Sequence, residues 1–409
     1  MTVIVCGAGA AGLMAAGTAA KYADRVILIE KNDRVGRKLR ITGKGRCNIT
    51  NSRDVAEMID MYPTNGKFLY SALYTFTNDD MVSLLEELGV KTKVERGGRI
   101  FPVSDDARDV VAAMRRYAMR DNVKLVKAKV KAIIIENGAV MGVSTSAGRF
   151  LGDRVIVCTG GASYPQTGSD GSGYELARQA GHTVTDITPS LVPLTVEEDI
   201  CRDLSGLSLR NVKTAAYGKR GRKLYEGFGE MLFTHFGVSG PLILSMSAHI
   251  RKEAAKGCTL EIDLKPALAP EKLDARILRD LEANNRKHLI NSLDALLPKA
   301  LIPVVIENAG IEPHKPAAEV TKAERLRLGE AIKRFTLHIT GLRPVEEAIV
   351  TSGGVKTSEI DPSTMESKLV KGLYFAGEII DIDGYTGGYN LQAAWSTGYL
   401  AGINAGGGI

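Results

Sequence analysis

The stretch from Thr2 to Glu30, TVIVCGAGAAGLMAAGTAAKYADRVILIE, decides the fold of this 409-residue chain. It contains an apolar β-branched run at Thr2–Cys6, a glycine-rich turn, an alanine-rich segment to about Tyr22, and a second apolar run at Val26–Ile29. These patterns predict a strand, a helix and a second strand, which together make a βαβ unit. The sequence therefore predicts an α/β fold built on a parallel sheet.

The turn after the first strand has the glycine spacing of a dinucleotide-binding loop. Gly7 permits the tight turn, Gly9 lets the backbone approach a pyrophosphate, and Gly12 allows the helix to pack closely on the strand. Free N–H groups and the positive end of the helix dipole then face the phosphates. Glu30 follows Gly12 by 18 residues, at the end of the second strand. A carboxylate there accepts hydrogen bonds from a ribose hydroxyl, which favours FAD or NAD over NADP.

The C-terminal region favours FAD over NAD. Residues 372–378 read as a strand that ends in Gly377 and Glu378, and residues 383–390 (DGYTGGYN) precede a helix from Leu391 to about Leu400. We expect Glu378 to accept from ribityl hydroxyls and the amides of the last helix to face the flavin pyrimidine, where negative charge builds up on reduction. A dehydrogenase that binds only NAD does not need this second element.

Two middle segments fit the same domain. The run Val155–Gly161 predicts a buried strand that enters a glycine turn beside the cofactor. Runs at Val130–Ile135 and Val140–Thr145 predict a hairpin that turns at Asn137 and Gly138, with Val130 near the adenine. No second strand, G-x-G-x-x-G and helix follows, so we expect no separate nicotinamide domain. NAD(P)H stays a candidate transient electron donor.

From about Thr188 the pattern changes. Short alternating runs, including Val212–Tyr217 and Leu260–Leu264, predict a small antiparallel β unit. Helical patterns follow at Pro270–Leu281, Ser292–Leu297, Pro298–Asn308 and Ala323–Phe335. The expected parts are an FAD-binding domain of residues 1–187 and 343–409, a β-rich insert of residues 188–266 and 335–342, and a helical subdomain of residues 267–334.

Composition narrows the class of protein. The net charge of +6 is spread along the chain, which favours a solvated surface and a few cations near an anionic cofactor over a nucleic-acid footprint. The most apolar run, Leu296–Ile306, is interrupted by Pro298, so no membrane span is expected. Strand-like sequence from Val3 predicts a cytoplasmic protein without a signal peptide. Five scattered cysteines with no C-x-x-C pair argue against a disulfide framework and a metal site.

A basic segment follows the ribose-binding acid. Arg37, Lys38, Lys44 and Arg46 place four cations within ten residues, among glycines that let the backbone approach a ligand. A pyrophosphate and a reduced flavin are both anions that such a loop suits, whereas the alternative is a solvated basic loop. For Cys47 in this segment, packing or proximity to the flavin is favoured over catalysis, because no partner cysteine lies nearby.

Five long motifs give the chain a family resemblance. They are VGRKL leading to TGKGRCNITN (residues 35–51), CTGGASYP (158–165), LFTHFGVSGP (232–241), VTSGGV (350–355) and the C-terminal motif described above. With these motifs in this order, the chain resembles the bacterial YhiN/BaiN-like flavoproteins, also called the aminoacetone oxidase-like or HI0933-like family. The resemblance implies a split Rossmann-type FAD domain of the two-dinucleotide-binding kind, a β-barrel-like insert and a small helical domain. It also implies an oxidoreductase, with activities from amine oxidation to double-bond reduction in steroid acids.

His235 is the candidate catalytic residue among six histidines. It lies in a predicted loop of the insert, between aromatic residues and ahead of Gly237, in a motif that the resemblance places over the isoalloxazine. A histidine there is suited to exchange the substrate proton that accompanies hydride transfer, because its pKa lies near operating pH. The alternative, a histidine that packs or holds the loop, stays open.

The sequence thus predicts an FAD-dependent oxidoreductase that moves a hydride between flavin N5 and a small organic substrate, as a monomer or dimer. An RNA-modifying flavoprotein and a non-catalytic redox sensor are the alternatives. The candidate cofactor-binding residues are Gly7, Gly9, Ala10, Ala11, Gly12, Glu30, Lys31, Arg37, Lys38, Gly45, Arg46, Asn48, Val130, Thr159, Gly160, Gly161, Gly377, Glu378, Asp383, Gly388, Tyr389, Asn390 and Leu391.

Overall fold

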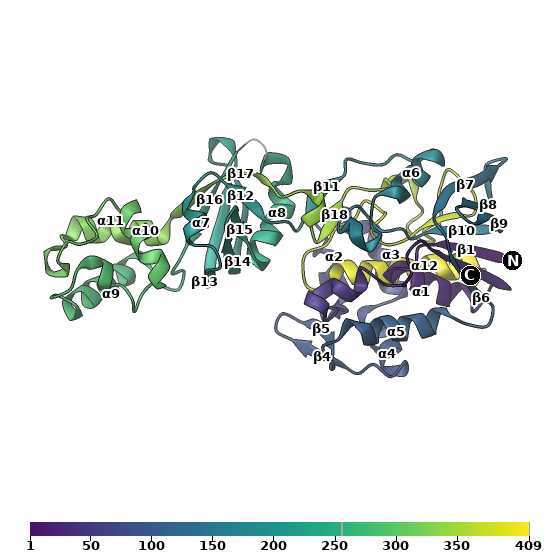
Figure 1. Ribbon diagram of the computed structural model, residues 1–409, viewed down its shortest axis with the longest axis horizontal. Coiled ribbons are helices and arrows are strands. Elements are labelled where there is room, and N and C mark those ends of the chain that lie inside the picture. The colour runs from purple at the N-terminus through teal and green to yellow at the C-terminus, as the bar shows by residue number, and fades with distance from the viewer. Residues whose placement is uncertain (255–256, 409) are drawn as a thin grey trace. The chain divides into compact units, whose positions relative to one another are not determined.

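A computed structural model describes residues 1–254 and 257–408. The chain forms two compact units, Met1–Ser190 with Val345–Ile409, and Leu191–Pro344 (Figure 1). Each unit has its own core of buried apolar side chains. The first unit is therefore split in sequence, because the second is inserted between its two segments.

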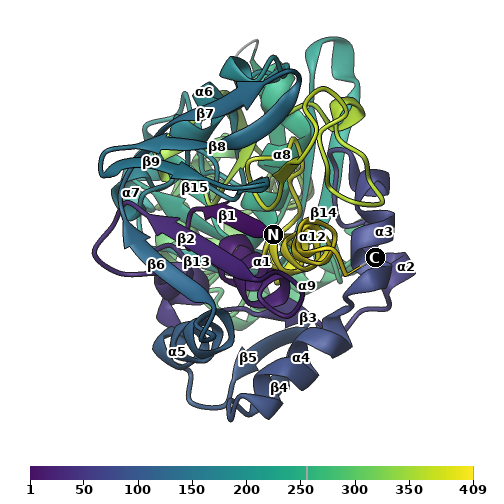
Figure 2. The same ribbon diagram turned by 90° about the vertical axis from the view of Figure 1, so that its right-hand side faces the viewer.

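A five-stranded parallel sheet forms the centre of the first unit (Figure 2). Its strands lie in the order β19-β10-β1-β2-β6. Their bounds are Leu373–Phe375 for β19, Arg154–Val157 for β10, Thr2–Cys6 for β1, Arg25–Glu30 for β2 and Val123–Lys127 for β6. All four neighbouring pairs are parallel, which confirms the predicted α/β fold. The carboxyl ends of β2, β1, β10 and β19 consequently meet at one edge of the sheet.

Two helices pack against each other beside this sheet, α1 (Ala10–Ala19) and α12 (Tyr389–Gly406). Three glycines of α12 face α1. An added Cβ would lie 2.5 Å from Ala11 O at Gly398 and 2.8 Å from Ala15 O at Gly402. This small-residue contact brings the last helix of the chain against the first.

Smaller elements complete the first unit. A meander of β7 (Val130–Glu136), β8 (Ala139–Thr145) and β9 (Gly148–Leu151) confirms the hairpin predicted at Asn137 and Gly138. The other strands of the first unit are β3 (Thr50–Asn51), β4 (Thr92–Glu95), β5 (Arg99–Pro102), β11 (Thr188–Ser190) and β18 (Val350–Ser352). Its other α-helices are α2 (Val55–Ile59), α3 (Tyr70–Thr75), α4 (Asn78–Glu87), α5 (Ala107–Ala118) and α6 (Ser172–Gln179).

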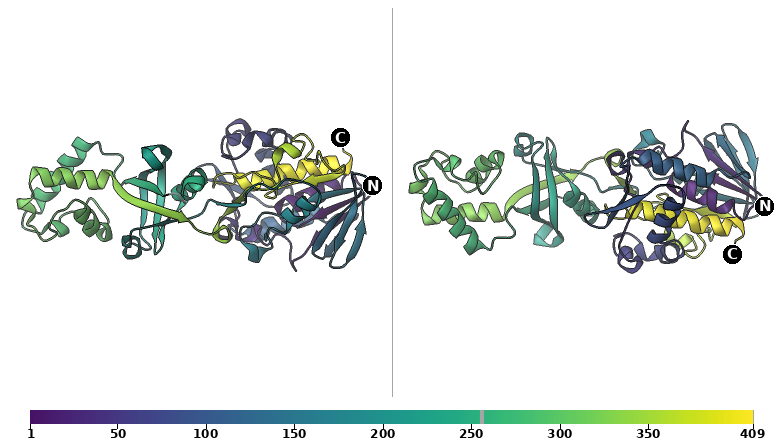
Figure 3. Two further views of the ribbon diagram at one scale, coloured as in Figure 1. Left: turned by 90° about the horizontal axis from the view of Figure 1, so that it is seen from above. Right: turned by 90° about the horizontal axis from the view of Figure 1, so that it is seen from below.

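The second unit contains a closed antiparallel barrel of strand order β12-β15-β14-β13-β16-β17, and the helical segment between β16 and β17 lies beyond one end of it (Figure 3). The strands are β12 (Leu194–Val196), β13 (Ser208–Tyr217), β14 (Lys223–Thr234), β15 (Gly237–Ser239), β16 (Cys258–Asp263) and β17 (Phe335–Leu342). The helices are α7 (Ile200–Asp203), α8 (Pro241–Ala254), α9 (Pro270–Ala283), α10 (Ile302–Asn308) and α11 (Lys322–Lys333).

The helix predicted at Ser292–Leu297 is wrong. These residues form turns, in which the N–H groups of Leu296 and Leu297 both bond to Leu293 O. Their leucines are buried, so the apolar spacing reflects packing and not a continued helix. Pro298 disfavours the helical conformation at the residue before it and so limits this segment to a turn. Within residues 1–254 and 257–408, no helix has the length and apolar character needed to cross a membrane.

Candidate functional site

The three glycines of the turn between β1 and α1 have different surroundings. Gly7 has φ of +102°, and an added Cβ would lie 2.5 Å from Cys158 O. An added Cβ at Gly12 would lie 1.8 Å from Gly7 O. Gly9 has a φ of −81°, and an added Cβ there meets no atom within 4 Å outside its chain neighbours. The fold therefore requires Gly7 and Gly12, whereas the space beside Gly9 is open.

The start of α1 presents backbone donors to this space. Gly9 is the N-cap and provides no side-chain acceptor. The first N–H groups of a helix, here those of Ala10, Ala11 and Gly12, have no acceptor within the helix. Such a start, with an open glycine before it, suits a phosphate group.

Glu30 closes the same turn from the end of β2. Its Oε2 accepts from the Ala8 N–H at 2.8 Å, and its Oε1 accepts from the backbone and side-chain N–H groups of Asn32 at 2.9 and 2.7 Å. A carboxylate has about four acceptor positions. Oε1 is therefore saturated by described groups, and Oε2 keeps room for one more donor. That spare position is where the sequence predicts a ribose hydroxyl.

A second carboxylate follows β19 and is arranged in the same way. Glu378 Oε1 accepts from the Ser163 hydroxyl at 3.0 Å and from the Thr351 N–H at 2.9 Å. Lys38 Nζ donates to Oε2 at 2.6 Å and to Ser163 Oγ at 2.6 Å. Thr351 Oγ1 in turn accepts from the N–H groups of Ala162 and Ser163. Oε2 again keeps room for one more donor, at the position expected for a ribityl hydroxyl.

The electrostatics of this cluster keep Glu378 ionised. Burial alone raises the pKa of its carboxyl. The Lys38 ammonium, followed by the donors from Thr351 and Ser163, outweighs burial and lowers the pKa below its usual value. An ionised acceptor with one open position is thus fixed at the carboxyl edge of the sheet.

Several other candidates join these two acids. Gly377 lies against α1, since an added Cβ would be 2.8 Å from Ala11 Cβ. Gly160 has φ of +75°, and at Gly161 an added Cβ would be 2.4 Å from Thr351 Oγ1. The Thr159 hydroxyl is buried without a hydrogen-bond partner among the described residues. Thr159, Gly160 and Gly161 follow β10, whereas Gly377 follows β19.

The start of α12 is built from the remaining C-terminal candidates. Gly388 has φ of +101° and approaches the Thr50 carbonyl so closely that an added Cβ would be 2.3 Å from it. With its amide in the orientation that satisfies its bonds, Asn48 accepts from the Gly388 N–H at 3.0 Å. Asn390 bonds to the backbone of Gly384, so it holds the preceding loop. Leu391 is partly buried in the first turn of this helix.

Two further C-terminal candidates are bonded to protein groups. Asp383 is fully buried, and its carboxylate accepts from the hydroxyls of Ser190 and Ser352 at 2.6 and 2.9 Å. The Tyr389 hydroxyl accepts from Arg53 Nε at 3.0 Å. Both residues therefore fix the segments around α12.

The basic segment does not act as one group. Lys38 belongs to the Glu378 cluster, and Arg37 is exposed beside Asn32. Arg46 pairs with Glu95 at 2.8 Å and lies over the Phe101 ring at 4.0 Å from its centroid. Only Lys38 among these three cations is held at the carboxyl edge of the central sheet by its contacts.

The other basic-segment candidates have separate surroundings. Gly45 has φ of +85° and, like Gly9, no atom within 4 Å of an added Cβ. Lys31, directly after Glu30, pairs with Asp170 at 2.8 Å. Cys47 is fully buried, and burial raises the pKa of its thiol to about 12, which leaves it unreactive. Val130 begins β7 and is partly buried.

His235 lies in the second unit. It occupies the turn between β14 and β15, where Thr234 pairs with Gly237. The His235 side chain is exposed, and its ring meets that of Phe236 edge to face at 5.0 Å. The predicted loop position is confirmed, and its catalytic role stays a prediction.

Sequence reasoning missed Ser163 and Thr351 as parts of the site. Each is a small polar residue beside glycines at the end of a strand, in the motifs GGAS and VTSGG. That context was a local signal for both. Their bonds to Glu378 and Lys38, however, depend on segments far apart in sequence.

These features fit an FAD molecule by their chemistry. The open backbone at Gly9 and the free donors of α1 suit its pyrophosphate, and Glu30 and Glu378 each offer one acceptor position to a hydroxyl. The fold and the site together define a dinucleotide-binding protein of the Rossmann type.

Comparison with known proteins gives the family. Residues 1–404 match the HI0933-like protein Rossmann domain. The chain is 34% identical to a 3-dehydro-bile acid delta(4,6)-reductase of Clostridium scindens, over 97% of both chains. It is 32% identical to a ribosomal RNA dihydrouridine synthase of Haemophilus influenzae, over 98% of this chain and 97% of that one. The chain therefore belongs to the HI0933-like family of flavoprotein oxidoreductases, and the prediction of an enzyme in this family is confirmed.

Solved structures share the fold. A 3-ketosteroid delta1-dehydrogenase of Sterolibacterium denitrificans superposes with a TM-score of 0.54 at 14% identity, with both chains covered completely. The FrdA chain of E. coli quinol fumarate reductase gives a TM-score of 0.52 at 16% identity, over 100% of this chain and 70% of that one. At these identities the similarity concerns architecture alone.

Proposed function

We propose that this protein binds FAD and reduces a carbon–carbon double bond that is conjugated to a carbonyl group. Two relatives support the proposal, because a delta(4,6)-reductase and a dihydrouridine synthase both add hydrogen across such a bond. Two relatives with different substrates share this one chemistry. This shared chemistry favours double-bond reduction over amine oxidation, the two activities that the sequence resemblance implied.

The candidate residues have separate roles in this proposal. The turn at Gly9 and the start of α1 hold the pyrophosphate. Glu30 accepts from the adenosine ribose, and Glu378, oriented by Lys38, accepts from the ribityl chain. Bound FAD supplies hydride transfer, as flavins do in other enzymes. His235 is the candidate proton donor to the substrate carbon next to the carbonyl.

The substrate class has two candidates. The sequence favours a small organic molecule, and the bile-acid reductase relative agrees with it. The ribosomal RNA dihydrouridine synthases, at 32% and 31% identity, support a uridine of RNA to the same degree. Identity within this narrow range does not separate the two substrates.

Stopped-flow absorbance tests the reaction. The purified protein is reduced anaerobically with NADH or NADPH and then mixed with oxygen, a steroid 4-en-3-one acid, or an unmodified ribosomal RNA fragment. We expect a yellow protein with one FAD per chain, slow oxidation by oxygen, and fast oxidation by one of the two unsaturated compounds. Fast oxidation by oxygen combined with flavin reduction by amines would instead identify an amine oxidase.

A further inference from the structure

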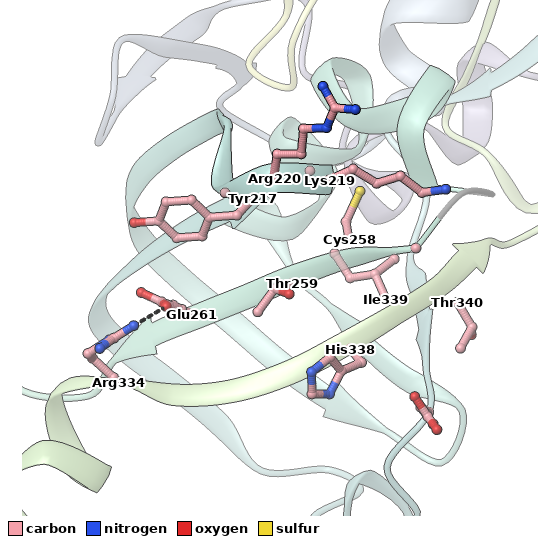
Figure 4. Close-up of a pocket in the computed structure, with 14 residues that line it drawn as sticks. Tyr217, Lys219, Arg220, Cys258, Thr259, Glu261, Arg334, His338, Ile339 and Thr340 are labelled. Carbon is pink, nitrogen blue, oxygen red and sulfur yellow. Dashed lines mark hydrogen bonds and ion pairs between the residues drawn. The ribbon is translucent and has the colours of Figure 1, made fainter.

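The outer face of the barrel has a hollow of about 980 Å³ in the second unit. It lies over β13, β16 and β17, and the turn between β13 and β14 forms one side of it (Figure 4). Its lining includes the rings of Tyr217 and His338, the hydroxyls of Thr259 and Thr340, and the cations Lys219 and Arg220. None of these residues has a role in the cofactor site.

The register of the barrel strands shows which side chains lie side by side in the hollow. Tyr217 pairs with Thr259 across β13 and β16, and Thr259 pairs with His338 across β16 and β17. A small threonine therefore stands between two rings on the same face of the sheet. With neighbouring strands about 4.8 Å apart, the outer two strands are roughly 10 Å apart at this level. That gap admits a flat ring against the face of Tyr217 or His338.

The turn beside this gap concentrates positive charge. Residues 219–223 read KRGRK, four cations in five residues. Lys223 pairs with Glu226, and Arg222 lies 3.3 Å from Glu253. Lys219 and Arg220 have no carboxylate partner among the described residues. The tight turn, in which Gly218 N–H bonds to Arg222 O at 2.9 Å, holds these two cations next to Tyr217.

One of the two carboxylates that line the hollow is paired with a cation. Glu261 pairs with Arg334 at 2.7 Å, as the dashed line in Figure 4 shows. Glu198 does not line the hollow, and its Oε1 lies 2.6 Å from His338 Nδ1, a contact that holds this ring in place. Glu197, the other lining carboxylate, is the negative charge that partly offsets Lys219 and Arg220. The unpaired charge at the turn is therefore positive.

We propose that this hollow is a docking surface for RNA, in which Lys219 and Arg220 bind backbone phosphates and a base stacks on Tyr217 or His338. Cations beside aromatic faces are the combination that single-stranded nucleic acids require. A membrane fits less well, because residues 218–223 contain no apolar side chain to insert into a bilayer. The proposal deepens the proposed function, since it names RNA as the molecule that presents the double bond.

Fluorescence anisotropy with a short labelled oligouridine tests the proposal at several salt concentrations. Replacing two phosphate-binding cations in K219A/R220A should make the slope of log K against log salt shallower by about 1.4. Affinity at moderate salt should fall about tenfold or more. Tyr217→Ala should weaken binding at least about fivefold through lost stacking. The control R286A/K287A removes two exposed cations of the same unit and should bind as the wild type does.

Four outcomes would overturn the proposal. The first three are wild-type binding and salt slope in K219A/R220A, equal loss in the control, and binding of vesicles containing phosphatidylserine in preference to the oligouridine. The fourth is competition by free UMP or NADPH at equal phosphate concentration, which would identify a mononucleotide site. The assay requires no turnover, so failed RNA binding and failed double-bond reduction are separate results. Thermal unfolding of each variant distinguishes a lost RNA contact from a loss of folding.

Discussion

Lys38 Nζ lies 2.6 Å from Glu378 Oε2, and this ion pair joins residues 340 positions apart in the sequence. Lys38 follows β2, and Glu378 follows β19 at the far edge of the same sheet. Ser163, which follows the neighbouring strand β10, bonds to both side chains. The pair therefore ties together the first and last segments that the candidate cofactor site requires.

Lys38→Met should destabilise the protein and weaken FAD retention. It leaves the partly buried Glu378 carboxylate without its cation, which costs about 2–4 kcal/mol. The folded-state pKa of Glu378 is lowered, so the stabilisation is present above its unfolded pKa and is lost as pH falls through the folded value. The effect of Lys38→Met, measured by urea unfolding, should therefore shrink in acid.

The control for this pair is Lys93→Met, which removes the partner of Asp105 in a more exposed ion pair and should have a smaller effect. The double variant Lys38→Met/Glu378→Gln should be less unstable than the sum of the single variants, because the two residues are in contact. Additive effects would contradict a coupled pair.

Gly9→Ala should separate cofactor binding from folding. An added Cβ at Gly9 meets no protein atom, so the FAD-free protein should keep its stability within about 0.5 kcal/mol. The methyl group occupies the space assigned to the pyrophosphate, so bound FAD per chain should fall sharply. Gly12→Ala is the matched comparison, and it should destabilise the fold itself because its Cβ would lie 1.8 Å from Gly7 O. Full FAD occupancy in Gly9→Ala would refute the pyrophosphate assignment.

His182 should make stability depend on pH. Its ring is buried, with Nε2 at 2.7 Å from Ser367 Oγ and Nδ1 at 3.2 Å from Glu359. Burial lowers the pKa of His182, and Glu359 offsets only part of this effect. The unfolded chain therefore binds the extra proton first, and stability falls as pH drops below the unfolded value of about 6.5.

The expected slope for His182 is at most about 1.4 kcal/mol per pH unit, measured by urea unfolding between about pH 8 and pH 5.5. His182→Gln should flatten this slope, whereas His288→Gln, at an exposed histidine, should leave it unchanged. An unaltered slope in His182→Gln would assign the dependence to another group.

His235→Asn should slow turnover without changing cofactor binding. The side chain is exposed on a turn of the barrel, so its replacement should leave the FAD spectrum and thermal unfolding unchanged. If His235 supplies the substrate proton, kcat should fall roughly 10²-fold, the range of a positioned acid or base. The measurement is the pH dependence of flavin reoxidation by the substrate identified in stopped flow. Wild-type rates would make His235 a structural residue.

The sequence by itself determined the local units of this protein. Hydrophobic period and the spacing of Gly7, Gly9 and Gly12 report on residues close together in the chain, so the βαβ unit and the hairpin at Asn137 could be predicted. The same kind of signal misled at Ser292–Leu297, where buried leucines follow a helical spacing without forming a helix. Glu30 could be predicted as the ribose-binding acid because it follows Gly12 by 18 residues, at the end of the second strand.

Only the tertiary structure decided which side chains meet. Parallel strands place their carboxyl ends at one edge, and the order β19-β10-β1-β2 brings Ser163 and Glu378 to Lys38. Arg46 pairs with Glu95 of β4, a partner that its sequence neighbours do not reveal, and its contact with the cofactor stays a prediction. Side-chain partners depend on which strands become neighbours, and composition and local periodicity do not encode that order.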